Sequence, residues 1–193
     1  MGLFRFFENR LEVYPEDNYN LPTDNFLKFL WACTKGLRGW IFAFMFLTGL
    51  IGVYESLLYK WIGDIVNWLG AYTPANLWAE KGDSLLMMAA VLVVSPILVG
   101  LSSLIHFQTL QGVFPMQMRW RFHRQMLGQS MEFYQDEFSG RVSAKVMQTA
   151  LAVRDTIMTI ADMLVYVLVY FVSSGIILFN LDSWLLIPFL LWM

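Results

Sequence analysis

Four apolar stretches, separated by polar segments, dominate the hydrophobic pattern of this chain. A helix that crosses the hydrocarbon core of a bilayer needs about 20 predominantly apolar residues. The pattern therefore predicts membrane spans over residues 39–59, 85–107, 163–181 and 184–193. The last span is truncated, since residues 183–193 make only about 16 Å of helix. Backbone carbonyls need partners inside a bilayer, so we expect the chain to be part of a longer protein. The alternative is a short re-entrant or interfacial tail.

The second apolar stretch is longer than a membrane span. No Lys, Arg, Asp or Glu occurs from Leu85 to Met118, a length of about 50 Å if the segment is helical. Polar residues return at His106 and Gln108. The span is therefore predicted to end near Phe107, and its helix to continue into the cytosol.

The distribution of Lys and Arg predicts the orientation, because these residues concentrate in cytoplasmic loops. Five of them precede the first span and six lie between the second and third spans, whereas residues 61–84 contain only Lys81, with Lys60 at the edge. The N-terminus and the loop 118–156 are thus predicted to be cytoplasmic. Residues 61–84 and 180–183 are predicted to lie outside.

The region before the first span divides into two parts. Residues 1–22 are predicted to form a cytosolic segment, with apolar residues at helical spacing up to Val13 and a Pro-bounded polar linker after them. Thr23 and Asp24 then offer a helix N-cap. The segment that follows carries aromatic residues on one side and Lys28, Lys35 and Arg38 on the other. It is predicted to be an amphipathic helix on the inner leaflet; the alternative is an ordinary soluble helix.

Composition agrees with an all-α integral membrane protein. Apolar residues make up 58% of the chain and charged residues 15%, against about a quarter in soluble domains. One cysteine, Cys33, excludes an internal disulfide. The sequence has no P-loop, zinc-protease, dinucleotide or EF-hand motif, so we predict no catalytic site, no metal site and no cofactor in this chain. Nothing in the charge pattern indicates a nucleic-acid partner.

The centre of the cytoplasmic loop is the most informative segment. Phe133 and Tyr134 precede an acidic pair, and Phe138 to Gly140 gives a turn signal, with Gly140 able to adopt a left-handed backbone. Apolar residues then recur at helical spacing from Val142 to Ile157. This pattern predicts a short helix at the tip of a helical hairpin, whose aromatic residues could anchor a partner protein. The alternative is a solvated, charged loop.

The loop resembles a known family. The residues that carry the resemblance are Arg119-Trp-Arg121-Phe-His-Arg124-Gln-Met-Leu127, Phe133-Tyr134-Gln-Asp136, Ser139-Gly140-Arg141-Val142-Ser143-Ala-Lys145 and Val153-Arg154-Asp155. They are similar to the first intracellular loop of ABC exporters with a type 1 transmembrane domain, and the resemblance extends over roughly residues 25–193. The chain departs from the family pattern at Gln135-Asp136, Lys145 and Gln148-Thr149.

The resemblance implies a six-helix transmembrane bundle, of which residues 23–193 would be a part. It implies long cytosolic helical extensions and a multi-pass location in a bacterial inner membrane. It also implies that the full protein is a homodimer that exports drugs, lipids or peptides. ATP and Mg²⁺ would bind in an ATP-binding domain outside this chain, on the same polypeptide or on a partner subunit. The residues implied to couple the membrane helices to that domain are Phe133, Tyr134, Gln135, Asp136, Ser139, Gly140 and Arg141.

Polar residues within the predicted spans are candidates for a substrate path, because such residues are costly in a membrane and often functional. The candidates are Glu55, Ser102, Gln108 and Asp162. The alternatives are an interfacial position for Glu55, a headgroup-level carboxylate for Asp162, and helix–helix hydrogen bonding for the polar residues of the second span. Rival functions are a secondary transporter or channel without an ATPase, and a non-transport membrane scaffold.

Overall fold

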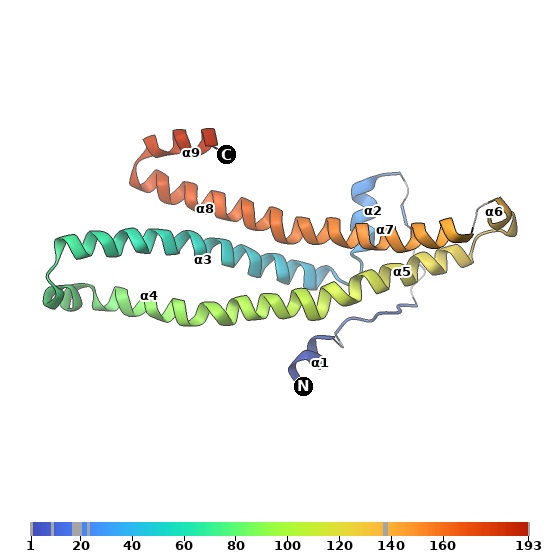
Figure 1. Ribbon diagram of the computed structural model, residues 1–193, viewed down its shortest axis with the longest axis horizontal. Coiled ribbons are helices and arrows are strands. Elements are labelled where there is room, and N and C mark those ends of the chain that lie inside the picture. Colours follow the sequence, from blue (N-terminus) through green and yellow to red (C-terminus); the bar gives the residue numbers. More distant parts are fainter. Residues whose placement is uncertain (1, 9, 17–20, 23, 137–138, 193) are drawn as a thin grey trace. The chain divides into compact units, whose positions relative to one another are not determined.

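A computed structural model describes residues 2–8, 10–16, 21–22, 24–136 and 139–192 (Figure 1). Within these ranges every regular element is a helix, which confirms the predicted all-α class. The chain divides into two compact units. Unit 1 consists of residues 1–44 and 103–162, and unit 2 of residues 45–102 and 163–193.

The helices follow one another in a simple order, and two of them include a π-helical segment at one end (η1 and η2). The elements are α1 (Gly2–Glu8), α2 (Phe26–Cys33), α3 (Arg38–Ala71), α4 (Pro74–Ser103), η1 (Leu104–Gln111), α5 (Gly112–Leu127), α6 (Met131–Asp136), α7 (Ser139–Thr159), η2 (Ile160–Leu164), α8 (Val165–Leu181), η3 (Ser183–Leu185) and α9 (Leu186–Trp192).

Three continuous helical runs in the described residues are long and apolar enough to cross a membrane. They are Arg38–Ala71, Asn76–Leu127 and Gly140–Leu181. Each contains one predicted span and continues beyond it. The length of the second apolar stretch predicted this for the second run, whereas the continuation of the first run to Ala71 was not predicted. A shorter apolar helix, Ser183–Trp192, occupies the position of the predicted truncated span.

Unit 1 has an apolar core between α5 and α7. Phe114, Met118 and Phe122 of α5 are buried, as are Val153 and Ile157 of α7. The residues on α7 belong to the helical repeat that the sequence predicts after the turn. This packing confirms the predicted pairing of one helix before the tip with one helix after it.

Helix α2 begins at a different cap from the predicted one. Asn25, and not Asp24, is the N-cap residue, and its side-chain oxygen accepts a hydrogen bond of 2.9 Å from the Leu27 N–H. Thr23 lies outside the described residues. The prediction was wrong by one residue because Asn and Asp satisfy a helix N-terminus equally well. Helix α2 buries Leu30 and Cys33 and packs against α7.

The N-terminal segment of unit 1 is attached to the second helical run. The side chains of Thr109, Gln117 and Trp120 donate hydrogen bonds to the carbonyls of Phe7, Glu12 and Pro15, at 3.4, 3.0 and 3.1 Å respectively. Phe7, Leu11 and Pro15 are buried. The helix ends at Glu8, so the apolar spacing up to Val13 overstated its length; Phe7 and Leu11 of the apolar set are buried, whereas Phe4 is exposed.

Candidate functional site

The tip of the hairpin in unit 1 contains the short helix that the sequence predicts. Helix α5 ends at Leu127, and α6 begins at Met131 after Ser130, whose hydroxyl oxygen accepts a hydrogen bond of 3.3 Å from the Phe133 N–H. Gly140 does not adopt a left-handed backbone but lies in the first turn of α7. The prediction for Gly140 was wrong because α7 starts earlier than the turn signal indicated. Among the described residues, the positive φ angle (87°) occurs at Gly36 instead.

Phe133 and Tyr134 hold α6 onto its own hairpin. Phe133 lines a cavity of about 230 Å³ together with Phe122 and Met126 of α5 and residues Val142 and Val146 of α7. The Tyr134 hydroxyl donates a hydrogen bond of 2.6 Å to the Met126 carbonyl, in the last turn of α5. The two aromatic rings meet edge to face at 5.3 Å. Both residues therefore have intramolecular contacts that the anchor hypothesis did not include.

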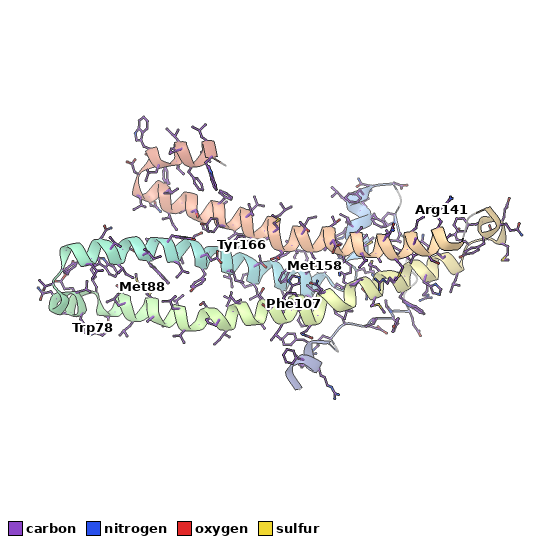
Figure 2. All side chains as sticks on the ribbon, viewed as in Figure 1. Trp78, Met88, Phe107, Arg141, Met158 and Tyr166 are labelled. Atoms are coloured by element: carbon purple, nitrogen blue, oxygen red, sulfur yellow. The ribbon has the colours of Figure 1, made fainter. Side chains whose placement is uncertain are left out.

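Other residues of α6 point to solvent. Met131 is 76% exposed, and Glu132 and Gln135 are exposed as well. Of the remaining predicted coupling residues, Gly140 and Arg141 are exposed, and Arg141 lies at the start of α7 (Figure 2). The side chains of Asp136 and Ser139 lie outside the described residues. Among the described residues of α6, Met131 is thus an exposed apolar side chain beside polar ones.

The candidate substrate-path residues fall in both units. In unit 1, Gln108 lies in η1 and the exposed Asp162 lies in η2. Both elements are π-helical, a local distortion that often occurs at functional positions. In unit 2, Ser102 is buried near the end of α4, and Glu55 of α3 is half-buried. No single site is formed by all four within either unit.

Glu55 makes a hydrogen bond that the sequence did not predict. The Tyr166 hydroxyl of α8 donates to its carboxylate. One turn farther along α8, the ring of Tyr170 stacks on that of Tyr166 at 5.9 Å with an interplanar angle of 17°. Glu55 is therefore joined to α8 and does not depend on Lys60 or Asp64 for a partner.

Small residues allow α3 and α8 to approach closely at this point in unit 2. A Cβ atom at Gly52 would lie 3.4 Å from the Tyr166 carbonyl oxygen and 3.5 Å from the Tyr170 nitrogen. The Ser56 hydroxyl donates to the Gly52 carbonyl at 3.0 Å and lies 3.3 Å from the Ser174 hydroxyl. Glycine and serine at four-residue spacing favour close helix packing in membranes. This spacing was the signal in the sequence that could have identified the pair.

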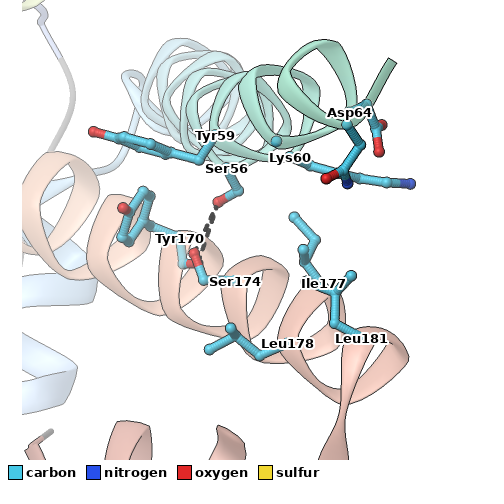
Figure 3. A pocket seen from close by; sticks show the side chains of 11 residues that line it. Ser56, Tyr59, Lys60, Asp64, Tyr170, Ser174, Ile177, Leu178 and Leu181 are labelled. Carbon is cyan, nitrogen blue, oxygen red and sulfur yellow. Dashed lines mark hydrogen bonds between the residues drawn. The ribbon is translucent and has the colours of Figure 1, made fainter. Parts of the chain in front are cut away.

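A cavity of about 350 Å³ lies beside this close approach, between α3 and α8 (Figure 3). Its polar lining comes mostly from α3, and its apolar lining comes from α8. The lining residues are Ser56, Tyr59, Lys60, Gly63, Asp64, Asn67, Tyr170, Ser174, Ile177, Leu178 and Leu181.

Arg121 was predicted only as part of a basic helical surface, but it is buried, with 5% of its surface exposed. Its guanidinium donates hydrogen bonds to the carbonyls of Cys33 and Lys35, at 3.5 and 2.9 Å. Cys33 is the last residue of α2, and Lys35 lies two residues beyond it. Arg121 therefore caps α2 from α5.

No cluster of three or more His, Cys, Asp or Glu side chains that could hold a metal ion occurs in the part of the chain that the structure describes.

Comparison with known proteins bears on the family resemblance. No family model matches the chain, and no solved structure matches it. The chain is 56% identical over 190 residues to an "uncharacterized ABC transporter ATP-binding protein" of Haemophilus influenzae. The resemblance to ABC transporters is confirmed. The match covers 98% of this chain and 31% of the relative. The chain thus spans about a third of the length of this relative, and three helical runs among its described residues are apolar enough to cross a membrane.

Proposed function

We propose that this chain is part of the transmembrane domain of an ATP-driven exporter for a hydrophobic or amphipathic substrate. The observation that carries the proposal is the helical hairpin of α5, α6 and α7, which occurs in a chain with high identity to an ABC transporter protein. A short helix at such a tip is suited to docking in a groove of another domain. The sequence contains no P-loop, so in this proposal ATP hydrolysis is assigned to an ATP-binding domain with Mg²⁺.

In this proposal α6 is the contact with the ATP-binding domain. Met131 supplies an exposed apolar side chain, and Glu132 and Gln135 supply a polar rim. Phe133 and Tyr134 fix α6 to α5 and α7, so that a movement of the docked helix is transmitted along both long helices. Nucleotide-driven closure of paired ATP-binding domains would then alternate access to the two sides of the membrane.

A secondary transporter or channel would need no such rigid tip. A loop that only connects two helices does not need a half-buried phenylalanine and a tyrosine hydrogen bond at its end. The packed tip and the ABC transporter relative therefore favour the exporter over the two rival functions. Homodimer formation and location in a bacterial inner membrane belong to the same proposal.

Membrane topology provides a test that needs no knowledge of the substrate. Single cysteines would replace the exposed residues Asn76 and Gln129 in the full-length protein lacking other cysteines. We expect a membrane-impermeant maleimide to label position 76 in intact cells, and position 129 only after the cells are opened, because basic loops stay in the cytoplasm. Labelling of position 129 in intact cells would contradict the proposed position of the tip.

A further inference from the structure

The strongest unassigned feature of unit 2 is a carboxylate surrounded by tyrosines. Glu55 lies within a predicted span, where an ionisable side chain is costly and is often functional. It accepts a hydrogen bond from Tyr166, which stacks on Tyr170. Tyr59 follows Glu55 by four residues on α3, and residues at this spacing lie on the same face of a helix. A carboxylate and two stacked rings thus meet between α3 and α8, and the exposed Tyr59 lies one turn farther along α3.

Two of these tyrosines, Tyr59 and Tyr170, line the cavity between α3 and α8, and Glu55 and Tyr166 lie next to them in the chain fold without lining it. Figure 3 shows Tyr59 and Tyr170 at the same end of the cavity, with Asp64 toward the other end. Ile177, Leu178 and Leu181 form the apolar part of the wall. The site can therefore surround a molecule with an apolar body while polar groups contact one part of it.

The charges favour one sign of ligand. The cavity contains the ammonium group of Lys60 and the carboxylate of Asp64, and Glu55 adds a second carboxylate one helical turn from Tyr59. The set has an excess of one negative charge. Aromatic rings also attract cations through their negative faces, and this attraction strengthens when water is excluded. The excess negative charge and the aromatic faces therefore both favour a cationic ligand.

We propose that Glu55, Tyr59, Tyr166 and Tyr170, together with the adjoining cavity, form a binding site for hydrophobic organic cations. The inference rests on the proposed function, because it names the substrate class of that transporter. The carboxylate would neutralise the positive charge, the faces of the tyrosine rings would contact that charge, and the apolar wall of α8 would hold the body of the ligand. The hydrogen bond from Tyr166 would keep the carboxylate directed toward α8.

Two ions of matched shape and opposite charge can test the proposal. Tetraphenylphosphonium and tetraphenylborate would be titrated against the full-length protein in lipid nanodiscs, without nucleotide, and binding to protein-free nanodiscs would be subtracted. We expect tetraphenylphosphonium to bind more tightly than tetraphenylborate. Glu55→Gln, which keeps the shape of the side chain, should raise the Kd for the cation by about tenfold, and leave the Kd for the anion unchanged or lower.

Further variants separate binding from helix packing. Asp64→Asn removes a charge from the cavity wall, and a smaller increase in the cation Kd is expected. Asp83→Asn removes an exposed carboxylate of α4 that does not line the cavity, and should leave both Kd values unchanged. An equal increase in the Kd values of both ions in Glu55→Gln, or an unchanged Kd for the cation, would overturn the proposed site. Because no ATP is present, cation binding without ATP-driven transport would instead contradict only the proposed function.

Discussion

Replacing Phe133 and Tyr134 together by alanine should disconnect ATP hydrolysis from movement of the membrane helices. Phe133 contributes to the wall of the cavity between α5 and α7, and the Tyr134 hydroxyl fixes α6 to the last turn of α5. Without these contacts α6 can still touch the ATP-binding domain, but it no longer transmits a displacement to the long helices. Coupling free energies between distant sites are typically about 1–3 kcal/mol. We therefore expect the nucleotide response of the membrane part to fall by about tenfold.

The response can be measured without a known substrate. A cysteine at Asn67, an exposed residue that lines the cavity of unit 2, would report the labelling rate with and without ATP plus vanadate. In the double variant ATP hydrolysis should continue while the nucleotide-dependent change in labelling is lost. Met147→Ala, which truncates a side chain 47% exposed on α7, is the matched control and should retain the change. Full retention in the double variant would argue against a coupling role.

Replacing Arg121 by methionine should have the largest effect on stability. The substitution keeps an unbranched side chain of similar reach but removes the two hydrogen bonds to the Cys33 and Lys35 carbonyls. Each hydrogen bond to a charged group contributes roughly 1.5–3 kcal/mol, so a loss of about 3 kcal/mol in the free energy of unfolding is expected. The loss should be local at first, because α2 is attached to the rest of unit 1 at this point.

Limited proteolysis of the full-length protein in detergent would detect this change. We expect the chain around α2 to be cleaved faster in Arg121→Met than in the native protein. Arg119→Met is the matched control, because Arg119 is only half-buried and its side chain donates to the Met116 sulfur at 3.6 Å. Similar cleavage rates in the two variants would show that the Arg121 hydrogen bonds contribute little to the attachment of α2.

Much of the fold could be predicted from the sequence because membrane spans and long amphipathic helices have strong patterns. The uncharged stretch after Leu85 predicted one helix that outlasts its span, and the repeat ending at Ile157 predicted a buried face of α7. The short helix at the tip also followed from the pattern of polar and aromatic residues. These features depend on the local chain and its period, which a single sequence contains.

The remaining features depend on partners far away in the sequence. Glu55 and Tyr166 are joined across two helices, and no periodicity links their positions. Arg121 is charged and lies among other basic residues, so the pattern alone placed it on a surface, whereas its position opposite the end of α2 buries it. The same reason explains Phe133: an aromatic residue in a polar loop can serve a partner or its own hairpin, and only packing distinguishes the two.

Cross-linking from Met131 tests the central claim most directly, because this exposed side chain is the proposed contact of α6 with the ATP-binding domain. A photo-reactive residue would be placed at position 131 of the full-length protein, and at the exposed position 76 as a control. Mass spectrometry would then identify the cross-linked peptides. We predict that position 131 is cross-linked to the ATP-binding domain and position 76 is not. Absence of that product at position 131, or equal amounts at both positions, would contradict the account.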